Sequence, residues 1–238
     1  MNIELPILFA DESLLAVDKP SGIFSVPDRY DPDASVALNI LAPVWGRLHV
    51  IHRIDKDTSG VLIYCRDEAV HRSLNGAFGT GAVVKTYHAL VRGAPDWDEA
   101  SCEFPLHVDA DKQHRTVIDA HHGKESRTNF RVLARYRGRA LIEARPETGR
   151  VHQVRVHLAA VGFPVIGDPF YGDGKPLMLS SIKRGWKGDP HTERPLLSRT
   201  ALHSVSVEFV HPLSGDKMLI EAPYPKDFRA SVSQLTNA

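Results

Sequence analysis

An aspartate stands inside a polar loop, in the sequence HRIDKDTSG. Asp55 follows the basic pair His52 and Arg53 and precedes the turn-forming residues 58–60, after which an apolar stretch begins. An aspartate beside Thr, Ser and Gly often does no more than close a turn through its own side chain. A carboxylate held rigidly over a hydrophobic core can instead act as a nucleophile or a general base. The loop by itself leaves both interpretations open.

A second polar loop, ETGRVHQVRVH, also runs into a hydrophobic element. Apolar residues from 151 to 161 recur at helical spacing, and Gly162 is placed to end the helix. His152 and Arg155 are three residues apart, so we expect both to project from one face into a cleft. An ion pair between Arg155 and Asp55 would keep the carboxylate charged. We therefore expect Arg155→Met to reduce activity far more than stability.

Metal centres and the common cofactors are not indicated. The chain has no GxGxxG, Walker or GxSxG motif, and its two cysteines form no CxxC pair. Its thirteen histidines include no HExxH motif. The candidate metal ligands among them are His49 with His52, His121 with His122, and His152 with His157. We predict no metal and no cofactor.

Composition favours a protein of the reducing cytoplasm. The 238 residues are 42% apolar, enough for a sizeable core, and the two cysteines are too few for a disulfide framework. No signal peptide or membrane span is indicated, so we expect no membrane partner. The formal net charge is zero, with 29 basic and 29 acidic residues. The segment from Ile182 to Arg199 is locally basic, which fits either a face for a polyanion or an ordinary solvated surface.

The pattern of elements predicts an α+β fold, with a mixed, mainly antiparallel, bent β-sheet flanked by helices and loops. We expect one domain over residues 1–238, with a central cleft, because no linker or repeat separates parts of the chain. A helix is expected from residue 67 to a stop at Gly79, and the tail from Ala230 is expected to fray. Strands are expected at 14–18, 60–66, 82–93, 129–136, 140–149 and 200–210.

Five ordered segments resemble the motifs of the RluA-type pseudouridine synthases. HRIDKDTSGVLIYCRD resembles the HRLD-x-x-TSG signature, with Ile54 in place of leucine. The others are LLAVDKPSGIFSVP, KTYHALVRG, the segment ETGRVHQVRVHLAAVGFPVIGDPFYG, and TALHS. Together they cover residues 7 to 225 in the family order. The resemblance implies the fold of a pseudouridine synthase catalytic core, in a short form that lacks an S4 module.

The resemblance also implies a role for particular residues. Asp55 matches the essential aspartate, Arg155 the arginine that pairs with it, and Tyr87 the tyrosine that stacks on the uracil. Arg53 matches an arginine that in some relatives fills the place of the flipped nucleotide, and Leu202 a late apolar residue that packs on the base. Alone, each would be read as an ordinary surface or core residue. The full set of predicted substrate-binding residues is Arg53, His52, Leu202, Arg150, Lys183, Arg184 and Trp186.

The implied reaction is site-specific isomerisation of uridine to pseudouridine in structured RNA, with the target base flipped out of its stack. The implied partners are transfer RNA, large-subunit ribosomal RNA or both, and we expect a monomer. Two other functions are considered. The protein could be an RNA-folding chaperone, which would not need Asp55, or a glycoside hydrolase, which would need a second acid that the sequence does not offer.

Overall fold

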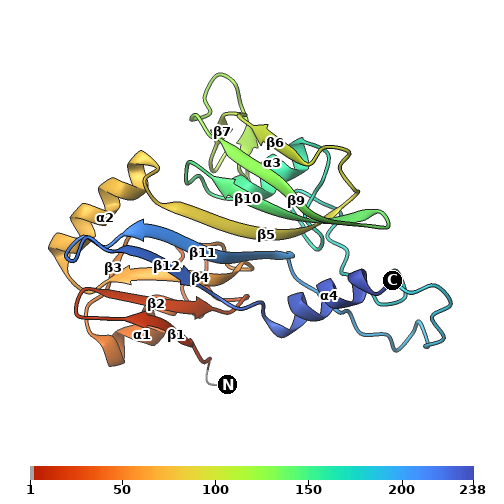
Figure 1. Ribbon diagram of the computed structural model, residues 1–238, viewed down its shortest axis with the longest axis horizontal. Helices are drawn as coiled ribbons and strands as arrows, with labels where there is room; N and C mark the ends of the chain where they lie inside the picture. The colour runs from red at the N-terminus through yellow and green to blue at the C-terminus, as the bar shows by residue number, and fades with distance from the viewer. Residues whose placement is uncertain (1–2) are drawn as a thin grey trace. The chain divides into compact units, whose positions relative to one another are not determined.

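A computed structural model of the protein describes residues 3–238, which divide into two compact units (Figure 1). The first unit comprises the chain up to Tyr87 together with His203–Pro223. The second comprises His88–Leu202 together with Tyr224–Ala238. A single domain over residues 1–238 with a central cleft stays a prediction.

The first unit contains a mixed, mainly antiparallel sheet, which confirms the predicted fold class. Its strands follow the order β1, β2, β4 and β11, with β3 on β4 and β12 on β11. The pairing of β4 with β11 is parallel, and the others are antiparallel. The bounds are β1 Ile7–Ala10, β2 Leu14–Lys19, β3 His49–Val50, β4 Ser59–Cys65, β11 Leu202–Val210 and β12 Lys217–Glu221, and the first residue of β11 belongs to the second unit.

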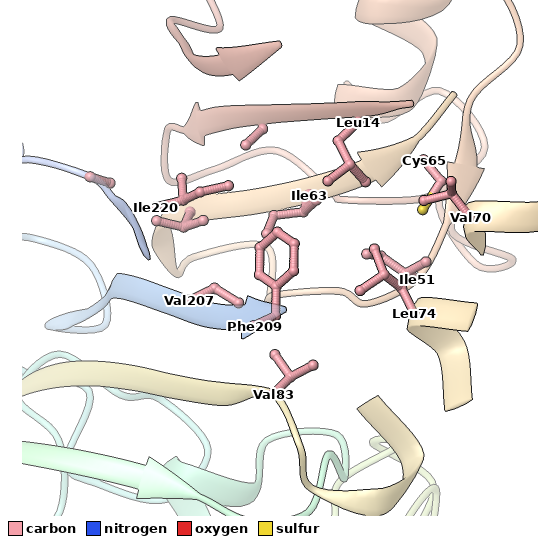
Figure 2. Close-up of a cluster of buried hydrophobic side chains, with 13 residues drawn as sticks. Leu14, Ile51, Ile63, Cys65, Val70, Leu74, Val83, Val207, Phe209 and Ile220 are labelled. Carbon is pink, nitrogen blue, oxygen red and sulfur yellow. The ribbon is translucent and has the colours of Figure 1, made fainter. Parts of the chain in front are cut away.

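Strand β4 is buried on both faces, as its unbroken apolar sequence predicts. Val61, Ile63 and Cys65 enter one hydrophobic core, shown in Figure 2, because successive side chains of a strand point to opposite faces. Leu62 and Tyr64 enter a second core. The strand is therefore held from both sides and forms a rigid base for the loop that precedes it.

The two helices of the first unit cover these two cores separately. Helix α2 (Glu68–Thr80) contributes Val70 and Leu74 to the core of Figure 2. Helix α1 (Ala37–Trp45) contributes Ala37 and Leu41 to the other core. Each helix therefore packs an apolar stripe against one face of the sheet.

Helix α2 is bounded by side-chain and backbone caps. The Asp67 side chain accepts a hydrogen bond from the backbone N–H of Val70, as an N-cap residue does. The predicted stop at Gly79 is wrong, because the helix continues to Thr80. Gly81 is the residue in the left-handed conformation, with φ of 77°.

The second unit has an antiparallel sheet in which β9 lies between β10 and β6. Strands β7 and β8 form a separate two-stranded sheet. Strand β5 begins in the first unit and ends in the second. The bounds are β5 Val84–Arg92, β6 Glu99–Cys102, β7 Leu106–His107, β8 Val117–Ile118, β9 Thr128–Tyr136, β10 Arg139–Pro146, α3 Gln153–Ala160 and α4 Lys226–Thr236.

Helix α4 corrects the expectation of a frayed tail from Ala230. It runs over Lys226–Thr236 and buries Phe228, Ser231 and Leu235. Asp227 in its first turn pairs with Arg199, with 2.8 Å between its Oδ2 and the arginine Nε. Buried apolar side chains and this ion pair hold the helix in the second unit. None of the helices in residues 3–238 is long and apolar enough to cross a membrane.

Candidate active site

The loop that carries Asp55 is fastened to the first unit on both sides of the aspartate. Ile54 is buried in the second core, and its backbone N–H and C=O both bond to the Ser25 hydroxyl, at 3.1 and 2.7 Å. The carbonyl of Lys56 accepts from the Gly22 N–H and from the buried ammonium of Lys19, at 2.8 and 3.1 Å. These bonds fix the backbone on either side of the carboxylate, as a catalytic group requires.

The loop then enters β4 through a close approach to β11. Gly60 has φ of 111°, and a Cβ at this position would lie 2.1 Å from the carbonyl oxygen of Ser204. Only glycine fits both this conformation and this contact. Gly60 therefore belongs to the support of the Asp55 loop, which explains its place in the TSG sequence.

Tyr87 lies near Asp55 in the first unit. It packs against the same core as Ile54. Burial raises the pKa of the Tyr87 phenol above its usual value, and the negative charge of Asp55 raises it further. Tyr87 therefore keeps its proton at neutral pH and can offer an aromatic face and an O–H donor beside a carboxylate. The structure thus brings together two of the three predicted catalytic residues.

His52 is used inside the first unit. Its Nε2 accepts a hydrogen bond of 2.9 Å from the backbone N–H of Ile63, and its ring stacks on Phe78 at 5.0 Å. Burial lowers its pKa to about 3, with a smaller contribution from the charge of Lys85, so the ring is neutral at pH 7. These contacts tie the start of the loop to β4. Contact between His52 and RNA stays a prediction, whereas the neighbouring Arg53 is exposed to solvent.

Arg155 makes a buried bidentate ion pair with Asp168 in the second unit. Its Nε and Nη2 donate to the two carboxylate oxygens at 2.7 and 2.9 Å. Both side chains are almost fully buried, at 5% and 0% exposed. Burial by itself would raise the pKa of the Asp168 carboxyl group. The hydrogen bonds and positive charge of Arg155 act in the opposite direction, as do hydrogen bonds from two backbone N–H groups, and the pKa lies below the usual 3.8. The pair fixes the orientation of the guanidinium.

Aromatic rings complete the surroundings of Arg155. The guanidinium lies 5.2 Å from the centre of the Tyr171 ring and 5.7 Å from that of Phe170. His152 stacks on Phe170 and shares a hydrogen bond of 2.9 Å with the Tyr171 hydroxyl. His152 and Arg155 therefore contact the same two aromatic rings. They do not share a helix face as expected, since His152 has φ of 56° at the N-cap of α3 and residues 153–158 are all buried. Their projection into a cleft stays a prediction.

Sequence reasoning missed Asp168. It lies in the sequence GDPFYG, where an aspartate before Pro and aromatic residues is typical of a turn. Its carboxylate does accept from the N–H groups of Phe170 and Tyr171, as a turn aspartate would. No spacing rule links it to Arg155, which is thirteen residues away. The ion pair of Arg155 with Asp55 stays a prediction.

The remaining predicted substrate-binding residues lie in the second unit. Leu202 is buried, and the others are partly or fully exposed. Arg150 donates to the carbonyl of Glu125 at 3.2 Å. Trp186 packs closely over Gly188, where a Cβ would lie 2.2 Å from the indole ring. Trp186 therefore contacts its own loop, and stacking on RNA stays a prediction. Lys183 and Arg184 are exposed in the same loop.

No metal centre is found in the described part of the chain. Within residues 3–238, no three His, Cys, Asp or Glu side chains are grouped so that they could hold a metal ion. Cys65 and Cys102 are free and buried. In the first unit, Asp55 and Tyr87 offer the chemistry of a carboxylate beside a protonated phenol.

Comparison with known proteins identifies the family. The profile of the RNA pseudouridylate synthases matches residues 13–160, more than half of the chain. The chain belongs to the RNA pseudouridylate synthase family. Ribosomal large subunit pseudouridine synthase D of Zymomonas mobilis is 32% identical over 241 residues, covering 96% of this chain and 72% of that protein. Ribosomal large subunit pseudouridine synthase C of Escherichia coli is 34% identical, covering 98% of this chain and 70% of that protein.

Solved structures agree on the fold of this pseudouridylate synthase. Human RNA pseudouridylate synthase domain containing 4 superposes with a TM-score of 0.73 at 23% identity, covering 97% of this chain and 92% of that one. The family and enzyme class predicted from the sequence are confirmed. The protein isomerises uridine to pseudouridine in RNA, and neither a chaperone nor a glycoside hydrolase is favoured.

Proposed function

We propose that this synthase acts on a uridine of large-subunit ribosomal RNA and that Asp55 carries the chemistry. The names of the two relatives described above support the substrate class. The observation that carries the catalytic assignment is the carboxylate of Asp55 in a loop fastened on both sides, near the partly buried ring of Tyr87. A flipped uracil could lie on this ring with its ribose at the carboxylate.

The reaction breaks the bond between N1 of uracil and C1′ of ribose and forms a bond between C5 and C1′. N1 gains a proton, and the hydrogen on C5 leaves as a proton, so the mass does not change. Asp55 would act either by attacking C1′ or by removing the 2′ proton. No electron carrier is needed, because nothing is oxidised or reduced.

The other site residues have supporting roles in this proposal. Tyr87 supplies the stacking surface, and its raised pKa keeps the phenol protonated at pH 7, so that it can donate an O–H hydrogen bond. In this proposal Arg155 pairs with Asp55, and the bidentate ion pair with Asp168 keeps the guanidinium of Arg155 in a fixed orientation. Arg53, exposed beside Asp55, fills the space that the flipped nucleotide leaves.

Binding of a folded RNA needs further contacts to phosphates. We assign these to the predicted basic residues Arg150, Lys183 and Arg184, and we expect Leu202 to pack near the base. The synthase is proposed to work as a monomer in the cytoplasm.

Mapping of pseudouridine in total RNA, from cells with and without the gene, tests the proposed substrate. The expected result is one or a few large-subunit ribosomal uridines that are modified only when the gene is present. A copy of the gene carrying Asp55→Asn serves as the control and should not restore the modification. Gene-dependent sites confined to transfer RNA would contradict the assignment to ribosomal RNA, because the ribosomal sites would then be unchanged.

A further inference from the structure

A basic pocket lies in the second unit, apart from the residues with proposed catalytic roles. It has a volume of about 480 Å³ and is lined by Tyr136, Arg137, Arg139, Ser181, Ile182, Arg184, Leu235 and Ala238. Three segments form it: the turn between β9 and β10, the loop around 181–184, and the end of α4. In Figure 1 these are the turn between the two green strands and, in teal and blue, the loop and the last helix.

Arg139 joins two of these segments. Its Nη2 donates to the carbonyl and hydroxyl oxygens of Ser181, at 3.2 and 2.9 Å, and its Nη1 donates to the carbonyl of Arg137 at 3.4 Å. These bonds hold the guanidinium at the wall of the pocket. The planar guanidinium is therefore already oriented in the protein without ligand, so its side chain loses less conformational entropy when a ligand binds.

One strong donor of Arg139 has no partner within the described chain. Its Nε is buried and meets no acceptor in residues 3–238. An unsatisfied buried donor on a cation is costly, so such a group in a pocket wall calls for an acceptor from outside. An anion in the pocket would supply it.

The charge of the pocket points the same way. Arg137, Arg139 and Arg184 line it, and none of the eight lining residues has an acidic side chain. Burial lowers the pKa of Arg139, and the nearby positive charge of Arg92 lowers it further. Arginine side chains are therefore concentrated in this lining, although the whole chain has no formal net charge.

We propose that this pocket binds a backbone phosphate of the RNA substrate, outside the target nucleotide. A phosphate offers the several acceptor oxygens that an arginine fork and two further guanidinium groups can share. Such a contact fixes the register of the RNA and carries no base specificity. The identification of the ligand as RNA rests on the proposed function. Among the pocket residues only Arg184 was expected from the sequence to bind RNA, whereas Arg137 and Arg139 were not.

Two exposed arginines of the pocket give the first test, because their replacement leaves the bonds of Arg139 intact. Arg137→Gln with Arg184→Gln should raise the KM for the RNA, or its Kd, by about tenfold and leave kcat unchanged. The slope of log affinity against log salt should become shallower by about 0.7 to 0.9, the value for one lost phosphate contact.

The matched control is Lys226→Gln with Arg229→Gln, which removes the same charge from exposed positions of α4 outside the lining. A control that weakens binding as much as the pocket variant would overturn the proposal.

The signal of the Arg139 Nε–H group in a nuclear magnetic resonance spectrum gives the second test. Adding RNA to the wild-type protein should shift this signal, whereas inorganic phosphate at equal ionic strength should shift it much less. A shift with inorganic phosphate alone would make the pocket a site for a free anion and overturn the proposal. An unchanged signal with bound RNA would overturn it as well.

The two proposals fail separately. RNA binding and the Arg139 signal are measured without turnover, so they test the pocket even if mapping shows no gene-dependent pseudouridine. Normal pseudouridine formation by the double pocket variant, with wild-type KM and salt slope, would overturn the pocket and the phosphate contact assigned to Arg184, and would leave the proposed substrate and the role of Asp55 standing.

Discussion

Asp55→Asn is expected to abolish pseudouridine formation and to leave RNA binding intact. Asparagine keeps the shape of the side chain but can neither attack C1′ nor remove a proton. The rate of a single turnover should fall by at least about 10³-fold, the upper part of the range for loss of such a group. The measurement is release of tritium from 5-labelled uridine in RNA, next to a binding titration of the same variant.

Asp57→Asn is the matched control, since it makes the same change two residues away in the same loop. It should keep most of the activity. Full tritium release by Asp55→Asn would contradict the assignment of the chemistry to this carboxylate. Equal loss in both variants would show that the loop needs its charges for structure, not that Asp55 acts on the ribose.

Arg155→Met is expected to reduce both stability and activity, which changes the expectation drawn from the sequence alone. The substitution leaves the carboxylate of Asp168 buried without its cation. Removing one partner of a buried pair costs about 3–5 kcal/mol in the free energy of unfolding. The deficit should shrink at low pH, because protonation neutralises the stranded carboxyl group. Urea denaturation at several pH values measures it.

Two further variants separate the structural role of Arg155 from its proposed catalytic role. Arg115→Met breaks a partly exposed pair with Asp111 and should cost no more than about 1 kcal/mol. Arg155→Met combined with Asp168→Asn removes both charges and should recover much of the stability without recovering activity. Recovery of activity in this double variant would show that Arg155 serves the fold alone.

The elements around the Asp55 loop could be predicted because their sequence patterns are local. Strand β4 is uniformly apolar, and it is buried on both faces. Helix α2 has an acidic cap and apolar residues at helical spacing. In both elements the side chains that decide the structure are neighbours along the chain, so periodicity alone finds them.

The other helices carry weaker signals. Helix α1 contains Pro43 and begins after Val36 without a side-chain cap, so it lacks the usual start signal. Helix α4 buries Phe228 and Leu235 with Ser231 between them, which leaves a sparse apolar stripe. Packing in the folded unit, rather than local preference, stabilises such helices.

The candidate site was predicted as a set of residues, but its supporting contacts were not. Asp55 and Tyr87 were named from motifs, and the structure places them near each other. The bond between His52 and Ile63 and the pair of Arg155 with Asp168 join residues with no periodic relation. Buried polar groups find their partners in three dimensions, so the sequence gives no rule for them.

A structure of the synthase bound to its substrate RNA tests the central claim most directly. The account predicts a flipped uridine whose base lies against the Tyr87 ring, with C1′ about 3.5 Å from a carboxylate oxygen of Asp55, the distance of a reacting pair. A target uridine bound away from Asp55 and Tyr87, in RNA that the same protein converts to pseudouridine, would contradict it.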